Sequence, residues 1–322
     1  MQDYTFRPWQ EGDDLQLLQL WKDAEDPQQE AFRGLLTADN EGEPFSRTLV
    51  AEHQGIPVAA GTVYESSLHD HHLWVYVEVA EDHRRQGLGS ELLRRLREAA
   101  GEAPSGVTSL RAKVISDSGG RQFASAQGFE TVQHIDTVRV EAGGVPPVPL
   151  RVDEDDRPTQ AVEDSATGSV ELTQAFWEFY RRSHQWDPPA EQSIGRVNRI
   201  FLSDEAEAYG ALVLRDGIQE AQKTGKKAPI VAFAVSYRPM QADLPGFEMP
   251  EDHATEVVLG YDFDYAGARE AIMQLLSLLV AQYPVTIEVQ ESMADLQTMM
   301  NPLVKMGSAK ILHRAEVMVS DQ

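Results

Sequence analysis

The sequence predicts an α/β fold with a mixed sheet, built as two tandem copies of one arrangement. Three observations support this prediction. The 322 residues amount to about two domains at roughly 150 residues each. Strand and helix patterns alternate along each half. A run of helix- and strand-breaking residues over 142–147, Ala-Gly-Gly-Val-Pro-Pro, separates the halves.

The first half begins with two amphipathic helices, because Leu15, Leu18 and Trp21 recur at helical spacing. Residues 73–79 are β-branched or aromatic at nearly every position and predict the clearest strand. The predicted order is helices 13–24 and 28–37, strands 48–53, 56–64 and 73–79, helix 90–100, strand 109–115, helix 119–126 and strand 132–140.

The second half repeats this order with little identity, which indicates a tandem repeat. Its predicted elements are helices 170–183 and 204–223, strands 230–237 and 256–263, helix 268–282, strand 285–289, helix 294–306 and strand 311–319. Residues 153–168 are polar and acidic without a period, which is typical of a linker. We therefore expect a first domain over 1–142, a linker over 143–168 and a second domain over 169–322.

Charge and composition exclude several functional classes. The chain has 28 Lys and Arg against 52 Asp and Glu, for a formal net charge of −24, so it lacks the excess of cations that nucleic acid binding requires. It has no cysteine, which excludes disulfides, thiolate metal sites and a cysteine nucleophile. Its start does not resemble a signal peptide, and no apolar stretch could span a bilayer. We expect a cytoplasmic protein with no membrane partner, no nucleic-acid partner and no metal.

Residues 84–89, Arg-Arg-Gln-Gly-Leu-Gly, lie between a strand and a helix that are both strongly predicted. Glycines allow the backbone to approach a bulky anion, and the N–H groups at a helix start point toward it. Arg84 and Arg85 add charge-assisted hydrogen bonds. A pyrophosphate fits these features. The alternative is a tight turn whose arginines are only solvated.

This segment resembles the acyl-CoA-binding motif of the GNAT N-acetyltransferase superfamily, Gln/Arg-x-x-Gly-x-Gly/Ala. The three defining positions are occupied by Arg84, Gly87 and Gly89. Residues 49–61 resemble the hairpin before the motif, and 117–129 resemble the strand-helix-Gly-Phe segment after it. The resemblance covers residues 4–140 and implies a GNAT fold that transfers an acetyl group from acetyl-CoA directly to a bound small primary amine.

The resemblance also implies roles for individual residues. Main-chain groups of the strand bind the pantetheine arm, the loop binds the pyrophosphate, and an N–H near Val79 stabilises the thioester oxyanion. The residues assigned to acetyl-CoA are Val77, Val79, Arg84, Arg85, Gln86, Gly87, Leu88, Gly89, Ser90 and Asp117. Asp117 replaces a common asparagine of the family. Ala124 replaces a tyrosine that protonates the leaving thiolate in many members, and alanine cannot do so.

Direct attack requires an unprotonated amine, so a base must accept its proton. Glu78 is the candidate base, because it is a carboxylate beside the expected thioester position in an apolar run. Tyr76 lies on the same face of the strand by the two-residue period and is the candidate that lines the acceptor pocket. Glu78 could instead point outward or pair with an arginine, and Tyr76 could serve packing alone.

The second half lacks the anion site. Residues 262–268 contain one glycine and no basic pair, and Asp262 and Asp264 would repel a pyrophosphate. We therefore assign activity to the first domain and regard the second as a degenerate copy. The alternative is a non-catalytic acyl-CoA-binding or sensory protein. A nucleotide-phosphate enzyme would need a Lys-Ser/Thr ending that the loop lacks.

Three weaker patterns favour simple interpretations. Residues 69–72, His-Asp-His-His, are metal-ligand types but adjacent, which favours a solvated loop. The alternative is a place beside the entrance for the acceptor. Residues 223–227 contain three lysines and are expected in an exposed turn. Four aromatic residues have the spacing of core packing: Phe176, Trp177, Phe179 and Tyr180.

Overall fold

The computed structural model describes residues 4–24, 27–239 and 253–321, which divide into two compact units. The first unit comprises Met1–Val132, Asp187–Ala190 and Glu316–Gln322, and the second comprises Gln133–Trp186 and Glu191–Ala315. These bounds differ from the predicted 1–142, 143–168 and 169–322. The difference arises because a short segment of a later loop and the end of the last strand pack within the first unit.

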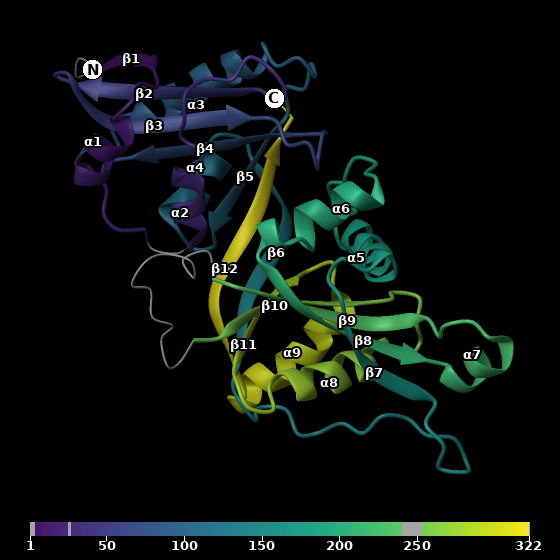
Figure 1. The fold of residues 1–322 in the computed structure, drawn as a ribbon. Helices are drawn as coiled ribbons and strands as arrows, with labels where there is room; N and C mark the ends of the chain where they lie inside the picture. The colour runs from purple at the N-terminus through teal and green to yellow at the C-terminus, as the bar shows by residue number, and fades with distance from the viewer. Residues whose placement is uncertain (1–3, 25–26, 240–252, 322) are drawn as a thin grey trace. The chain divides into compact units, whose positions relative to one another are not determined.

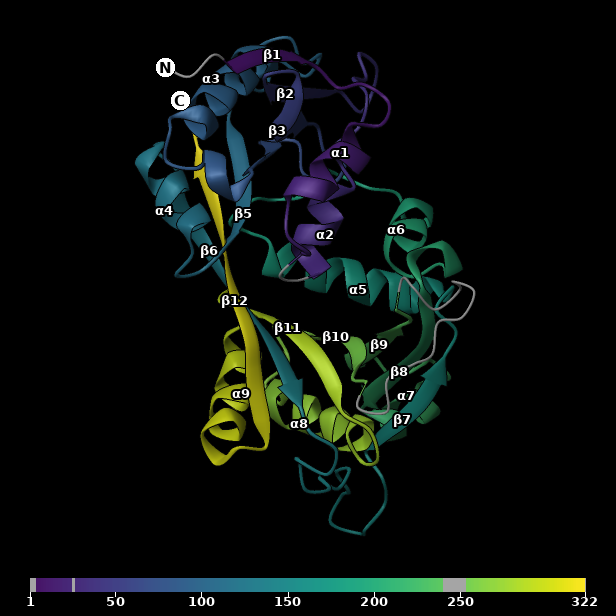
Figure 2. The same ribbon diagram turned by 90° about the vertical axis from the view of Figure 1, so that its left-hand side faces the viewer.

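The first unit is a mixed sheet with helices on both faces (Figure 1). Its elements are β1 (Tyr4–Pro8), α1 (Asp13–Leu20), α2 (Pro27–Arg33), β2 (Ser46–His53), β3 (Ile56–Tyr64), β4 (Leu73–Val79), the 3-10 helix η1 (Glu81–His83), α3 (Leu88–Ala100), β5 (Leu110–Ile115) and α4 (Gly119–Ala126). The order β1-β2-β3-β4-β5 is antiparallel up to β4 and parallel from β4 to β5. Figure 2 shows α3 and α4 on one face and α1 and α2 on the other.

Side chains on β4 alternate between two parts of the core. Leu73 and Val75 belong to the cluster that contains Leu93 of α3. Tyr76 packs against the cluster that contains Leu17 of α1. Strand β4 thus separates an aliphatic face under α3 from a face that carries aromatic and charged side chains.

The second unit repeats this layered plan. Its elements are β6 (Glu130–Val140) from Gln133 onward, β7 (Gln160–Ser165), α5 (Val170–Ser183), α6 (Ile194–Phe201), the 3-10 helix η2 (Asp204–Ala206), β8 (Ala208–Asp216), α7 (Ile218–Thr224), β9 (Ile230–Tyr237), β10 (Thr255–Tyr261), α8 (Ala268–Leu279), β11 (Val285–Gln290), α9 (Ala294–Met306) and β12 (Ala309–Ser320) up to Ala315. Its sheet order is β6-β11-β10-β9-β8-β7, with β10 and β11 parallel. Helices α5 and α6 lie on one face, and α8 and α9 lie on the other (Figure 2).

Several elements agree with the sequence-based prediction to the residue, among them β3, β4, α4, α5, β9 and α9. The aromatic side chains Phe176, Trp177 and Phe179 are buried, which confirms their role in the core. Residues 223–227 are exposed around the end of α7, as expected. No helix among the described residues is long and apolar enough to cross a membrane.

Two predictions for the second unit are wrong. The helix expected over 204–223 is instead β8 and α7, joined at Gly217 with φ 76°. Strand β8 pairs with neighbours on both sides, so its conformation is decided by partners distant in sequence. The predicted linker contains the edge strand β7, whose exposed Glu163 and Asp164 hide any apolar pattern. In the first unit, the periodicity of apolar residues does not predict strand β1.

Candidate functional site

Strands β4 and β5 are hydrogen-bonded only at their beginnings. The parallel ladder joins Leu73 to Leu110 and Trp74 to Arg111, and no further pair of the described residues continues it. The rest of β4 is paired with β3 on its other side. The two parallel strands therefore diverge, and the later part of β4 has an open edge.

Main-chain groups of alternate β4 residues face this open edge. The N–H of Leu73 donates to the carbonyl of Ser109 on the β5 side at 2.9 Å, whereas the N–H of Ala80 donates to β3 at 2.9 Å. Because these directions alternate along a strand, Val77 and Val79 face the β5 side. They are the two strand residues that the sequence assigns to the pantetheine arm.

The loop after β4 leads into an open helix N-terminus. Gly87 is the N-cap of α3 with φ 83°, a conformation that favours glycine, and no side chain caps the helix. A Cβ on Gly87 would meet no heavy atom within 4 Å. The first N–H groups of α3 lack intrahelical acceptors and lie beside this open space, where the helix dipole favours an anion.

The two arginines of the loop differ in their contacts. The Nε of Arg84 donates to the carbonyl of Val79 at 2.9 Å and ties the loop to the end of β4. Arg85 has φ 62° and an exposed side chain. No described residue forms an ion pair or hydrogen bond with that side chain. Arg85 can therefore reach a ligand without giving up a protein contact.

Neighbouring side chains brace the loop. The hydroxyl of Tyr4 donates to Oε1 of Gln86 at 3.0 Å, and Nε2 of Gln86 donates to the carbonyl of Asp82 at 3.0 Å. The Oγ of Ser90 accepts from Gln127 at 3.1 Å. The side chains of Gln86 and Ser90 therefore hold the loop in place.

The other assigned residues lie at the starts of α3 and α4. Leu88 is buried, and a Cβ on Gly89 would lie 3.4 Å from the ring of Phe123. Asp117 has φ 59° in the turn before Ser118, which caps α4. Among the described residues, no hydrogen bond or ion pair joins Asp117 to the loop over residues 84–89, and its assignment to acetyl-CoA stays a prediction.

The carboxylate of Glu78 is fully engaged by donors. The side chain is 7% exposed and accepts from Nη2 of Arg33 at 2.6 Å and from Nε of Arg33 at 2.9 Å, on different oxygens. Gln29 donates to one oxygen at 3.1 Å, and the Tyr76 hydroxyl donates to the other at 2.5 Å. Glu78 and Tyr76 thus share a face of β4, as predicted. The arginine pairing considered as an alternative for Glu78 is present.

Arg33 and Gln29 are site residues that sequence reasoning does not identify. Both lie on α2, one helical turn apart, which is the signal that could have placed them on a common face. The hydrogen bond to Glu78 raises the pKa of Arg33 above its ordinary value. Burial, with the Glu78 charge, raises the pKa of the Tyr76 hydroxyl, which therefore stays protonated.

Aromatic rings surround this carboxylate. Phe32 stacks on Tyr76 with ring centroids 5.3 Å apart and lies 5.9 Å from Trp74. The Arg33 guanidinium lies 5.1 Å from the centre of the Trp21 ring. Rings beside a carboxylate suit a ligand that joins an apolar body to an amine.

Comparison with known proteins identifies this arrangement. Residues 9–129 match the model of the acetyltransferase (GNAT) family. The first unit carries a GNAT domain. A search of curated proteins found no match to the chain.

Solved structures extend the likeness to both units. A GCN5-related N-acetyltransferase from Sphaerobacter thermophilus is 15% identical, with 98% of this chain and 95% of that chain covered, at a TM-score of 0.63. A tandem GNAT protein from the clavulanic acid biosynthesis pathway is 13% identical, with 99% of this chain and 98% of that chain covered, at a TM-score of 0.62. A GCN5-related N-acetyltransferase from Kribbella flavida is 13% identical, with 98% of this chain and 70% of that chain covered, at a TM-score of 0.52. The chain therefore has a tandem GNAT fold.

The GNAT domain has no hydroxyl group at position 124. Ala124 is 5% exposed and packs in the core cluster with Leu93 and Phe129. The neighbouring Phe123 contacts the start of α3 beside Gly89. Protonation of a leaving thiolate in this GNAT domain would need water or another side chain.

The corresponding turn of the second unit is filled by an arginine. Gly267 is the N-cap of α8, and a Cβ there would lie 2.1 Å from Nη2 of Arg151. Arg151 donates to the Tyr265 hydroxyl at 2.6 Å and pairs with Glu270 at 2.8 Å and Asp216 at 3.5 Å. A guanidinium of the chain itself therefore occupies the space beside this helix start.

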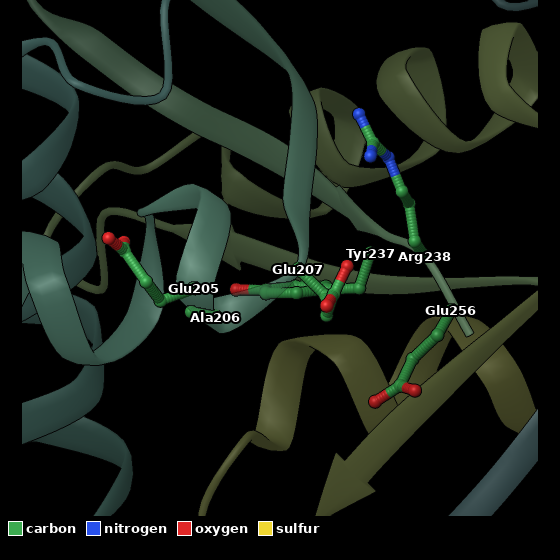
Figure 3. Close-up of a pocket in the computed structure, with 6 residues that line it drawn as sticks. All are labelled: Glu205, Ala206, Glu207, Tyr237, Arg238 and Glu256. Carbon is green, nitrogen blue, oxygen red and sulfur yellow. The ribbon is translucent and has the colours of Figure 1, made fainter. Parts of the chain in front are cut away.

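A pocket of about 380 Å³ in the second unit has the wrong charge for a CoA phosphate. Figure 3 shows its lining, with carboxylates of Glu205, Glu207 and Glu256 around it and the Arg238 guanidinium directed away from Glu256. Like charges would repel a phosphate.

The prediction of a solvated loop over residues 69–72 is wrong in part. His71 and Asp70 are exposed, but His69 is 5% exposed, and its Nδ1 lies 2.7 Å from the carbonyl oxygen of Asp187. His72 lies 3.2 Å from the Asp187 carboxylate. The loop is held by a distant segment that its own sequence does not reveal. No group of three or more His, Asp or Glu among the described residues is placed to hold a metal ion.

Proposed function

We propose that the protein is an N-acetyltransferase that transfers an acetyl group from acetyl-CoA to a small primary amine, and that the first unit carries the reaction. The observation that supports this most is the open N-terminus of α3 at Gly87, next to the free edge of β4. The pyrophosphate would bind the α3 N–H groups and Arg85. The pantetheine arm would pair with the main chain of Val77 and Val79.

The acetyl transfer follows from this placement. The amine nitrogen attacks the thioester carbonyl carbon, the carbonyl oxygen gains negative charge, and the C–S bond then breaks. The N–H of Val79 faces the open edge and would donate to that oxygen, which is the main electrostatic contribution expected in acyl transfer. Since Ala124 has no hydroxyl, the departing thiolate would take a proton from water.

Proton removal from the amine would pass through Tyr76. Glu78 already accepts four hydrogen bonds, so a substrate amine cannot reach it without displacing a donor. The Tyr76 oxygen would accept the amine proton while its own proton moves to Glu78. The amine loses one proton and the carboxylate gains one. Release of that proton from Glu78 to solvent then balances the proton that the thiolate takes from water.

Titration calorimetry with acetyl-CoA tests the binding. We expect micromolar affinity in the native protein and a loss of about tenfold to hundredfold in Arg85→Glu, because one charge-assisted contact becomes a repulsion. Arg182→Glu in the second unit is the matched control and should bind normally. Absence of binding at millimolar acetyl-CoA would overturn the proposal.

A non-catalytic acyl-CoA-binding protein is the second candidate. The four donors on Glu78 and the alanine at position 124 favour it. A panel of amines, with release of CoA thiol as the readout, separates the two functions. An enzyme releases thiol with at least one amine and slows about a hundredfold in Glu78→Gln. A binding protein holds acetyl-CoA and releases none. The net charge of −24 favours cationic amines in the panel.

A further inference from the structure

A four-residue segment from the later half of the sequence is part of the first unit. Asp187–Ala190 packs there, although the residues on both sides of it belong to the second unit. The N–H of Ala190 donates to the carbonyl of Leu68 at 2.9 Å. The Asp187 side chain has no exposed surface. A carboxylate buried this deeply must be compensated by donors or a cation.

Asp187 obtains its compensation from one cation and two imidazoles. Arg111 of β5 is 1% exposed and donates from Nη1 to the Asp187 carboxylate. His69 donates to the Asp187 carbonyl, and Nδ1 of His72 lies 3.2 Å from the carboxylate. Burial, with the Arg111 charge, lowers the pKa of His69, so that ring is neutral near pH 7. Arg111 is therefore the principal counter-ion of Asp187.

The Arg111 guanidinium lies on the ring of Trp74, 4.0 Å from its centre. Trp74 and Arg111 form the last pair of the β4–β5 ladder, directly before the strands diverge. Trp74 contacts Phe32, which stacks on Tyr76, whose hydroxyl donates to Glu78. A continuous series of contacts therefore runs from Asp187 to the proposed proton relay.

We infer that Asp187 is a positioning residue for the amine side of this site. Its charge holds Arg111 against Trp74 and thereby fixes the aromatic face of Trp74, Phe32 and Tyr76 beside Glu78. The inference rests on the proposed function for its effect on turnover, but not for its effect on Trp74. It gives the later half of the chain a defined contribution to the site in the first unit.

The test compares Asp187→Asn with His71→Ala, an exposed residue of the contacted loop. We expect Asp187→Asn to change the near-ultraviolet circular dichroism of Trp74, isolated by subtracting the spectrum of Trp74→Phe. It should lower kcat/KM for the amine about tenfold to hundredfold. The affinity for acetyl-CoA should stay within twofold of the native value, because Asp187 makes no contact with the Arg84–Gly89 loop. His71→Ala should match the native protein.

A second variant keeps the test decisive if Asp187→Asn does not fold. Removing both charges with Arg111→Met and Asp187→Leu leaves no unpaired buried ion, and such replacements commonly preserve a fold. The folded double variant should show the altered Trp74 spectrum and the weakened amine turnover. A native Trp74 spectrum in the folded variant would overturn the inference. If the native protein turns over no amine, the proposed function fails, while the Trp74 spectrum still decides the role of Asp187.

Discussion

The starts of α3 and α8 occupy the same place in two copies of one fold, yet they differ in what lies beside them. Gly87 has open space where a Cβ would be, whereas at Gly267 that space holds the guanidinium of Arg151. The first turn carries two exposed arginines, and the second contains Tyr265, which binds Arg151. A glycine at a helix start therefore leaves room for an anion only when nothing else of the chain fills the turn.

The two units also differ in how deeply an ion pair is buried. In the first unit, Arg33 and Glu78 form a bidentate pair with side chains 11% and 7% exposed. In the second, Arg182 pairs with Asp264, at exposures of 34% and 78%. Burial makes the first pair costly to break and keeps its geometry fixed, whereas the second is screened by solvent.

The largest effect is expected from filling the open turn. Gly87→Val places a branched side chain in the ligand space and should weaken acetyl-CoA binding more than about a hundredfold, because several main-chain contacts are lost. Gly225→Val is the matched control, since Gly225 has φ 68° and an equally open surrounding at the end of α7. Both variants should lose about 1–2 kcal/mol of stability from the left-handed backbone. Normal acetyl-CoA binding by Gly87→Val would show that the open space beside Gly87 does not distinguish the two turns.

The next largest effect is expected from breaking the buried ion pair between Arg33 and Glu78. Arg33→Met leaves Glu78 without its cation and should lower the free energy of unfolding by about 3–5 kcal/mol. Arg182→Met should cost less than about 1 kcal/mol, because that pair is largely exposed. Urea denaturation measures both. Equal losses would show that burial does not distinguish the two pairs.

A smaller effect depends on pH. Arg94 and Arg95 lower the pKa of Glu91, in the first turn of α3, from 4.5 to about 2. The stabilisation by this carboxylate is therefore complete above pH 4.5 and is lost as the pH falls toward 2. Because the Glu91 side chain is 35% exposed and solvent screens its ion pairs, Glu91→Gln should cost less than about 1 kcal/mol at pH 6 and nothing near pH 2. A difference in stability that grows on acidification would contradict this sign.

The last prediction is that removing Arg151 does not change the number of acetyl-CoA molecules bound per chain. Calorimetry should give one acetyl-CoA per chain in the native protein and also in Arg151→Ala. Removing Arg151 opens the turn at Gly267, but the carboxylates of Asp216 and Glu270 remain and repel a pyrophosphate. A second equivalent in Arg151→Ala would show that the arginine alone closes the second turn.

The sequence predicts those parts of the site whose signals are local. Strand β4, the loop over residues 84–89 and the amphipathic α3 follow from periodicity and from glycines next to a helix start. Glu78 and Tyr76 share a face because alternation along a strand is fixed by geometry.

The parts that the sequence does not predict come from distant residues. Arg33 is 45 positions from Glu78, Asp187 is 76 from Arg111, and Arg151 is 114 from Tyr265. No short-range pattern encodes such contacts, because tertiary packing alone brings these side chains together. The same reason accounts for β8, whose partners on both sides decide its conformation.

Because of Arg151, the two units should respond differently to the concentration of acetyl-CoA. The turn at Gly267 is filled by Arg151, a side chain of the same polypeptide, so its order does not depend on any solute. The turn at Gly87 has open space, and a bound anion would add to its order by mass action. Depletion of acetyl-CoA should therefore accelerate amide exchange at the start of α3 and leave the start of α8 unchanged.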